Sequence, residues 1–300
     1  MFHSINAENN ESKPDFILVG APKSGTTFLL NTLRQNPAIF LPPTNEIYFH
    51  SKQNEFSGPY DSKASAKITR ESAKYFEWFR HARTNQLVGE FATDYLYFFQ
   101  NSIPSIQKFC GHNIKILIVL REPTIRTLSH YKHMVSKGHE KLSFQDAIKS
   151  EAIRKAMGWR WAYQYRPISM YSEQVEAYVK AFSLVKVLIY EEIKNDRKAA
   201  LREIEDFLDV PKWEYGQLLT DTNIKNIYTK TWLKKVEKSL FKFDKNFSTS
   251  LSLEFSNRFS AQIALSEKDK KSLCLEFEED VSKLELILGR KIQVWKNLSV

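Results

Sequence analysis

The stretch of sequence that decides the fold reads FILVGAPKSGTTFLLNTL, from Phe16 to Leu33. Four apolar residues lead into a turn bracketed by Gly20 and Gly25, and a further apolar segment follows the turn. A strand, a glycine-bracketed turn and a helix in this order form a setting in which backbone N–H groups and a helix N-terminus bind phosphate. The sequence therefore predicts a phosphate-binding turn near the start of an α/β domain.

This turn has the GxxxxG frame of a nucleotide-triphosphate P-loop but not its ending. A Walker loop carries a lysine directly after the second glycine, where it reaches the terminal phosphates. Thr26 holds that place here, and the lysine comes earlier, as Lys23. The shifted lysine argues against ATP or GTP chemistry and favours another phosphorylated donor. A P-loop nucleoside or nucleotide kinase stays an alternative, for which Asp94 is the nearest candidate magnesium carboxylate.

A second anion-binding element follows the apolar segment Ile116–Leu120, which is typical of a buried parallel strand. Arg121 comes directly after it, Pro123 fits the first turn of a helix, and Ser129 lies two turns further on. Taken singly, Arg121 could be part of a structural ion pair and Ser129 an ordinary helix serine. Ligands of parallel sheets bind at the carboxyl ends of the strands, so both elements should open on one edge. Together they predict a ligand with two phosphates.

Short apolar segments of β type occur at four places: Phe16–Val19, Leu87–Gly89, Ile114–Leu120 and Val185–Tyr190. Helical patterns separate them, which predicts an α/β fold with a mostly parallel sheet. One predicted helix covers residues 171–182, and another begins after Asp196 as its cap. A third keeps an apolar face from Leu273 to Leu288, and Gly289 ends it.

Composition is compatible with one globular domain. Of the 300 residues, 42% are hydrophobic and 13% aromatic, enough for a core. We expect a single domain over residues 14–300, with a P-loop-like core and a mostly parallel sheet flanked by helices, after a polar leader at 1–13. No apolar run approaches the ~20 residues that cross a bilayer. Cys110 and Cys274 form no metal-spaced pair and are typical of free thiols in a reducing compartment, so we expect a cytoplasmic protein without a membrane span.

The formal net charge of +9 raises the question of an acidic partner. The basic residues are spread along the chain, with some concentration between Lys225 and Lys245. A spread surplus is more typical of a solvated surface than of a nucleic-acid interface, so we expect no nucleic acid as a partner. A non-catalytic nucleic-acid binder stays an alternative, supported by the charge balance alone.

The motifs resemble those of a known enzyme family. Pro22–Thr27 is similar to the 5′-phosphosulfate loop of sulfotransferases. Arg121–Pro123, with Arg126 and Ser129–Tyr131, resembles their 3′-phosphate motif. Further segments resemble elements of the heparan-sulfate-type and bacterial members or of the family as a whole: Asn45–Phe49, Leu188–Ile193, and Leu284–Arg290 with Trp295.

The resemblance implies a single α/β domain that moves a sulfuryl group from 3′-phosphoadenosine-5′-phosphosulfate (PAPS) to a hydroxyl or an amine, with no metal expected. Lys23 would contact the bridging oxygen and stabilise charge on the departing phosphate. Arg121 and Ser129 would hold the 3′-phosphate. The 5′-phosphate would be held by the rest of the first loop: Ser24, Gly25, Thr26 and Thr27.

The acceptor must lose a proton as it attacks, so a general base is needed. Glycan-type family members use a glutamate at the position that matches Glu46, which is our favoured base. His50 is the alternative, and His130 is expected to shape the 3′-phosphate site instead. Phe91 stands where the family often has Lys or Arg, which suggests a less anionic acceptor.

The acceptor itself is not determined by the sequence; a glycan, a glycolipid and a small metabolite are all open. The segment Met157–Arg166 interleaves arginines with aromatic residues. It could wall an acceptor pocket, or form a helix whose arginines extend along apolar surface towards solvent. The basic segment Ile224–Lys245 could cover the donor or meet the acceptor, although a solvated face is the simpler interpretation. Oligomeric state is not predicted.

Overall fold

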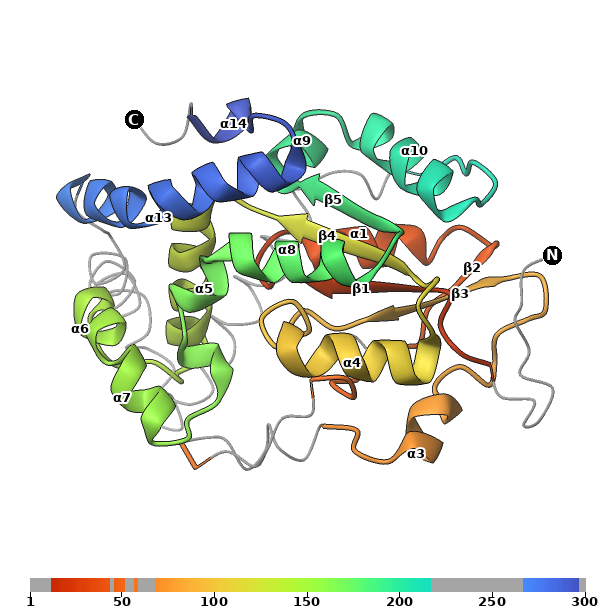
Figure 1. Cartoon of the computed structure of the whole chain (residues 1–300), viewed down its shortest axis with the longest axis horizontal. Coiled ribbons are helices and arrows are strands. Elements are labelled where there is room, and N and C mark those ends of the chain that lie inside the picture. The colour runs from red at the N-terminus through yellow and green to blue at the C-terminus, as the bar shows by residue number, and fades with distance from the viewer. Residues whose placement is uncertain (1–11, 44–45, 52–56, 59–67, 217–266, 297–300) are drawn as a thin grey trace, which may run out of the picture.

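The computed structural model describes residues 12–43, 46–51, 57–58, 68–216 and 267–296. Its centre is an all-parallel sheet of five strands in the order β2-β3-β1-β4-β5 (Figure 1). The strands of these residues are β1 (Phe16–Gly20), β2 (Ile39–Phe40), β3 (Leu87–Phe91), β4 (Lys115–Leu120) and β5 (Val185–Ile189). All five run the same way, so their carboxyl ends meet at one edge of the sheet.

The inner strands are buried on both faces, which is why their sequences are continuous apolar runs rather than alternating ones. Phe16 of β1 lies opposite Gly89 of β3 and Lys115 of β4, which fixes the register of the sheet centre. The four strands predicted from sequence are confirmed. The short β2 was not predicted, because two residues carry no recognisable pattern.

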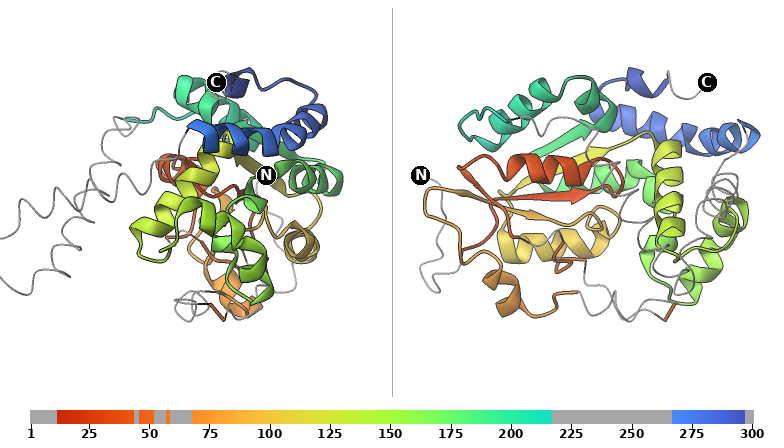
Figure 2. Two further views of the ribbon diagram at one scale, coloured as in Figure 1. Left: turned by 90° about the vertical axis from the view of Figure 1, so that its left-hand side faces the viewer. Right: turned by 180° about the vertical axis from the view of Figure 1, so that it is seen from behind.

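Two layers of helices cover the sheet. On one face, α1 (Thr26–Leu33) and α10 (Arg197–Leu208) pack against it. On the other face lie α4 (Phe99–Cys110), α8 (Tyr171–Ala181) and α13 (Glu267–Leu288). Figure 2 shows α1 in front of the sheet when the molecule is seen from behind. The described chain is thus a single α/β domain of three layers.

α5 and the short helices that pack around it form a further group beside the carboxyl edge of the sheet, at the left of Figure 1. These elements are α5 (Pro123–Ser136), α6 (Phe144–Lys149), α7 (Glu151–Ala156), η1 (Trp161–Tyr163) and η2 (Pro167–Ser169). Since ligands of parallel sheets bind at this edge, the group forms one side of the expected site.

The aromatic segment 157–166 contains one 3₁₀ turn, η1, and not the helix considered above; η2 begins directly after it. Tyr163 and Tyr165 are fully buried in the core around α5. The guanidinium of Arg154 lies over the rings of Trp159 and Tyr163, 4.9 and 5.0 Å from their centroids. The aromatic residues of this segment therefore contribute mainly to packing.

Three smaller helices complete the described fold. α3 (Ser72–Glu77) carries Tyr75, which stacks on Phe49 at 4.2 Å, so this aromatic cluster is core. α9 (Tyr190–Asn195) begins where β5 ends. α14 (Gln293–Lys296) follows α13 and packs on the same face of the sheet.

Side chains cap two helices as their sequences predict. The carboxylate of Glu122 accepts hydrogen bonds from the amides of Thr124 (3.0 Å) and Ile125 (2.6 Å), and Pro123 is the first residue of α5. Asp196 caps α10 in the same way. These contacts satisfy amides that the first turn of a helix leaves without partners.

α8 is capped from a distant part of the chain. Asp280 of α13 accepts hydrogen bonds from the amides of Tyr171 (2.7 Å) and Ser172 (3.1 Å). At its far end α13 stops at Gly289, whose φ of 63° is the left-handed conformation of a C-terminal glycine. The predicted cap Ser266 lies outside the described residues.

Other sequence predictions also fall outside the described residues: most of the leader 1–13, Asn45, and the basic segment 224–245. No helix that the structure describes is long and apolar enough to span a membrane. Cys110 and Cys274 are both free, as predicted.

Candidate active site

The carboxyl edge of the sheet collects the candidate residues. β1 leads into the glycine-bracketed turn, β3 into Thr93, β4 into Arg121 and β5 into Tyr190. β1 is hydrogen-bonded to β3 and to β4, and β4 to β5, so these four ends are neighbours. The two predicted anion-binding elements therefore open on one edge, as the sequence indicated.

The turn after β1 presents unused hydrogen-bond donors. No group of the described residues accepts a hydrogen bond from the amides of Lys23 to Thr27. No side chain caps α1 at Gly25, so the N-terminus of that helix is also without a partner. The hydroxyl of Ser24 is buried and has no hydrogen-bond partner in the described structure. Amides at a helix N-terminus, with a hydroxyl beside them, form a site for an anion.

Gly25 is required where it stands. Its φ of 79° is left-handed, and a Cβ built on it would lie 2.5 Å from the ring of Tyr190. A real Cβ would displace either this ring or the turn. The glycine therefore lets β5 and the first loop meet closely.

Lys23 lies in a strongly positive environment. Its φ of 70° is left-handed, and its carbonyl accepts a hydrogen bond from Arg121 Nη1 at 3.0 Å. Burial lowers the pKa of Lys23 to about 8, with smaller contributions from the charges of Arg121, Arg126 and Lys137. Cations held this close repel one another, so an anion bound among them would be strongly favoured.

Arg121 is held by tyrosines of α8 and α9. Its guanidinium stacks on the ring of Tyr190 at 4.9 Å, and its carbonyl accepts a hydrogen bond from the hydroxyl of Tyr171 at 3.0 Å. Its Nε makes no hydrogen bond and lies 4.0 Å from Glu191 Oε1. Ser129, the other predicted 3′-phosphate ligand, is half-buried on α5. A stacked guanidinium with spare donors is suited to phosphate.

Arg126 has a different place from Arg121, although both belong to the same motif. It is fully buried and donates hydrogen bonds to the hydroxyl of Ser169 and the carbonyl of Tyr165. It also lies 3.1 Å from Nδ1 of His130, whose pKa is lowered well below its usual value by burial and by Arg126. Arg126, which His130 contacts, thus connects α5 to η2; the shaping role of His130 stays a prediction.

Glu46 is half-buried and firmly oriented. Its Oε1 accepts hydrogen bonds from the amide of Thr93 at 3.2 Å and from the hydroxyl of the same residue, while Oε2 accepts from the hydroxyl of Tyr48. Tyr48 has a left-handed φ of 58°. Burial, Glu46 and Asp94 raise the pKa of Tyr48 well above its usual value, so its hydroxyl stays a donor. A carboxylate on this edge with a fixed orientation is suited to accept a proton.

His50, the alternative base, is fully buried. Its Nδ1 lies 3.0 Å from the hydroxyl of Ser105 and its Nε2 lies 2.9 Å from the hydroxyl of Tyr75. Both ring nitrogens are therefore engaged inside the core, which favours Glu46 as the residue that an acceptor can reach.

Residues that the sequence did not single out complete the site. Glu191 accepts a hydrogen bond from the amide of Glu122 at 3.3 Å and another from the indole of Trp295 at 2.9 Å. It therefore connects α9 with the start of α5 and with α14, next to Arg121. Tyr190 and Glu191 belong to a segment that resembles a family element, but its sequence pattern assigns neither residue a role. Thr93 lies in the segment around Phe91 that resembles a family element, but only the fold shows that it contacts Glu46.

Comparison with known proteins gives the family. A family model described as "Sulfotransferase domain" matches residues 13–269. The chain belongs to the sulfotransferase domain family. Family and fold place it among sulfotransferases and disfavour the nucleotide kinase.

Individual relatives of this sulfotransferase-family chain are distant. It is 24% identical over 238 residues to mouse heparan sulfate glucosamine 3-O-sulfotransferase 3A1, covering 77% of this chain and 54% of that protein. It is 23% identical over 286 residues to membrane-associated sulfotransferase kil1 of Dictyostelium discoideum, covering 68% and 58%. The chain thus spans about half the length of the curated relatives it matches. A solved sulfotransferase from Alicyclobacillus acidocaldarius aligns with a TM-score of 0.71 and 26% identity, covering 95% of this chain and 99% of that one.

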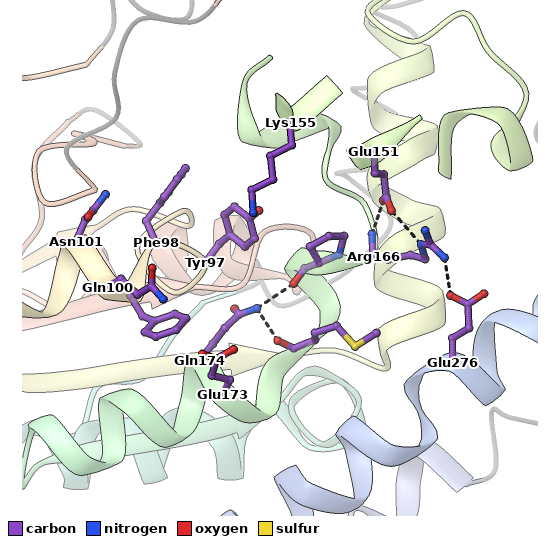
Figure 3. Close-up of a pocket in the computed structure, with 13 residues that line it drawn as sticks. Tyr97, Phe98, Gln100, Asn101, Glu151, Lys155, Arg166, Glu173, Gln174 and Glu276 are labelled. Carbon is purple, nitrogen blue, oxygen red and sulfur yellow. Dashed lines mark hydrogen bonds and ion pairs between the residues drawn. The ribbon is translucent and has the colours of Figure 1, made fainter. Parts of the chain in front are cut away.

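A separate hollow of about 700 Å³ opens between α4, α7, η2 and α8 (Figure 3). Tyr97 and Lys155 point into it, and Arg166 forms part of its wall through ion pairs with Glu151 (2.9 Å) and Glu276 (2.7 Å). None of the candidate site residues lines it. In the described residues, no group of three or more His, Cys, Asp or Glu side chains could hold a metal ion.

Proposed function

We propose that this chain moves a sulfuryl group from PAPS to a hydroxyl or an amine of a carbohydrate-containing acceptor. The observation that carries the proposal is the uncapped turn at the N-terminus of α1, with Lys23 and Arg121 packed beside it. Two groups of anion ligands on one sheet edge suit a nucleotide with phosphates at both ends.

The residues present fit such a donor. The free amides of the first loop and the unpartnered hydroxyl of Ser24 supply hydrogen-bond donors for a 5′-phosphate. Arg121, whose guanidinium stacks on Tyr190, would hold the 3′-phosphate together with Ser129 on the following helix. Burial is the main cause of the lowered pKa of Lys23, and the charges of Arg121, Arg126 and Lys137 add to it; a nucleotide with several negative charges would neutralise those cations.

The proposed chemistry depends mainly on position and charge. PAPS supplies an activated sulfuryl group, and in-line transfer of such a group needs stabilisation of the leaving phosphate more than covalent help. Lys23 in its ammonium form would stabilise the negative charge that develops on that phosphate. Glu46 would take the proton from the acceptor, with Thr93 and Tyr48 holding the carboxylate in place. No metal is needed in this scheme.

The charge around the site supports an acceptor that carries acidic or sulfate groups. Burial is the main cause that lowers the pKa of His133 to about 3, and the charges of Lys23, Lys137, His139 and Arg160 add to it. Such a field attracts anions. The matched relatives named for heparan sulfate support a saccharide as well.

This proposal revises the expectation of a less anionic acceptor. That expectation depended on Phe91, which stands where the family often has a basic residue. Phe91 is buried at the end of β3 and packs in the core beside β1. Its identity therefore says little about the charge of a ligand at the surface.

A donor-binding experiment tests the proposal first. Calorimetry should show tight binding of adenosine 3′,5′-bisphosphate and no magnesium-dependent tight binding of ATP. The reverse result would favour the kinase. Transfer from labelled PAPS should then be screened over sulfated glycans, neutral glycans, glycolipids and phenolic alcohols, with sulfated glycans expected to react fastest. No transfer to any saccharide would contradict the proposed acceptor class. A location in the cytoplasm and the lack of a nucleic-acid partner stay predictions.

A further inference from the structure

A buried polar cluster lies next to the candidate site but outside it. Its members are fully or almost fully buried and come from four parts of the chain: His50, Tyr75, Glu90, Tyr95 and Ser105. A carboxylate in such a place is costly unless every polar atom around it has a partner. The sulfuryl-transfer scheme above uses none of these residues.

Glu90 is the centre of this cluster. Its Oε1 accepts a hydrogen bond from the hydroxyl of Tyr95 at 2.5 Å, and its Oε2 accepts one from Tyr75 at 2.6 Å. Glu90 belongs to β3, in a register that places it opposite Ile17 of β1. The carboxylate is therefore fixed to the most rigid layer of the fold.

Both tyrosines connect Glu90 to one segment, Glu46–Ser51. The hydroxyl oxygen of Tyr95 accepts hydrogen bonds from the amides of Phe49 (2.9 Å) and His50 (3.2 Å). Tyr75 donates to Glu90, so its oxygen is left to accept from Nε2 of His50, 2.9 Å away. The other ring nitrogen of His50 can then accept from Ser105 at 3.0 Å. In this arrangement each polar atom of the cluster has a hydrogen-bond partner, and Nε2 of His50 also lies 3.4 Å from Glu90 Oε2.

The same stretch of chain also holds the other end of that segment. Thr93 follows β3 and contacts the carboxylate of Glu46, while Tyr95, two residues later, contacts the amides of Phe49 and His50. Glu46 itself has no regular secondary structure around it, since it lies outside every helix and strand. Its position thus depends on side chains that reach it from β3 and the residues after β3.

We propose that Glu90 is a positioning residue for the general base: through Tyr95 and the Tyr75–His50 pair, it fixes the segment that carries Glu46. The inference depends on the proposed function for the role of Glu46 but not for the placement of the segment. An apolar residue at this point of β3 would fill the core at lower cost. The proposed role explains why a carboxylate is buried here: it keeps the segment that carries Glu46 in a fixed position.

The test compares two equally buried carboxylates. Glu90→Gln keeps the size of the side chain, but its amide nitrogen cannot accept from a tyrosine hydroxyl. Glu205→Gln is the matched control, because Glu205 is also fully buried and accepts from Tyr215 (2.9 Å) and the amide of Trp213 (2.8 Å) on the opposite face of the sheet. Tyr95→Phe is a milder second variant that removes the hydroxyl alone.

Amide hydrogen exchange gives a readout that needs no activity. Glu90→Gln and Tyr95→Phe should speed exchange at Phe49 and His50 by about tenfold or more, whereas Glu205→Gln should leave both unchanged. In kinetics, both cluster variants should lower kcat by ~10- to 100-fold with the affinity for adenosine 3′,5′-bisphosphate kept within twofold.

Outcomes separate this inference from the proposed function. Unchanged exchange at Phe49 and His50 in Tyr95→Phe would overturn the positioning role. Equal losses of kcat in Glu90→Gln and Glu205→Gln at equal losses of Tm would reduce Glu90 to a stabilising residue and also overturn it. If the wild type transfers no sulfuryl group, the proposed function is contradicted. Faster exchange in Glu90→Gln and Tyr95→Phe would then still confirm that the cluster places the segment.

Discussion

The donor side and the base side of this site are built in opposite ways. The donor side depends on continuous sequence: one turn after β1 supplies Lys23 and the free amides, and Arg121 directly follows β4. The base side depends on long-range contacts, because Glu46 is held by Thr93, 47 positions away along the chain. Local geometry thus specifies the proposed nucleotide ligands, and the tertiary structure specifies the proposed base. Variants on the two sides should fail differently.

The largest effect is expected on the donor side, from Lys23→Ala. Removing the ammonium should lower kcat by about 10³-fold, because charge on the leaving phosphate loses its main stabilising group. Single-turnover transfer from labelled PAPS measures this loss. Lys180→Ala is a suitable control, since Lys180 is exposed and pairs with Glu176 on α8. Retention of more than a tenth of the activity would remove Lys23 from its role.

On the base side, Glu46→Gln should lower kcat by ~10²- to 10³-fold while adenosine 3′,5′-bisphosphate binds as in the wild type. The amide keeps the shape of the side chain but cannot take a proton at neutral pH. Calorimetry and steady-state kinetics on one preparation separate the two properties. Near-normal turnover would show that the base assignment is wrong. Glu77→Gln, at the exposed end of α3, controls for the loss of one charge.

Arg121→Ala separates the two phosphate sites that are proposed on the donor side. It should weaken adenosine 3′,5′-bisphosphate by ~10- to 100-fold, as expected for a lost charge-assisted contact, and adenosine 5′-monophosphate far less. Titration with both nucleotides measures the difference. Equal weakening would mean that Arg121 acts by supporting the Lys23 carbonyl and not by holding the 3′-phosphate.

The smallest effect concerns pH. Burial and nearby cations lower the pKa of Lys23 to about 8, so the ammonium form is lost as pH rises through that value. The donor kcat/KM should therefore fall about tenfold per unit above pH 8. Lys23→Arg should be slower but should lack this basic limb, because a guanidinium keeps its proton. A wild-type profile that stays flat to pH 10 would contradict the assignment of the limb to Lys23.

Most of the fold could be predicted from sequence, because its signals are local. Continuous apolar runs marked the strands, and Pro123, Asp196 and Gly289 marked helix ends at the places where the structure has them. The strand β2 was not predicted, because a strand of two residues has no recognisable sequence pattern. The segment 157–166 was ambiguous because buried aromatic residues and a pocket wall have the same composition.

The site was predictable only where its residues are continuous with a strand end. Lys23 and Arg121 follow β1 and β4, so parallel topology alone places them together. No sequence pattern shows that Thr93 and Tyr48 hold Glu46, or that His50 faces Tyr75 and Ser105 in the core. Those facts depend on how β3 and the residues after it pack against a segment without regular structure.

The contact between Glu191 and the indole of Trp295 has a consequence for biosynthesis. The first loop leaves the ribosome early, yet the wall behind Arg121 needs a residue 272 positions beyond Lys23 (295 minus 23). A nascent chain could form the sheet before this wall exists, but the proposed nucleotide pocket would be complete only when translation has passed Trp295. Donor affinity should then appear late and abruptly during synthesis, after most of the core has already formed.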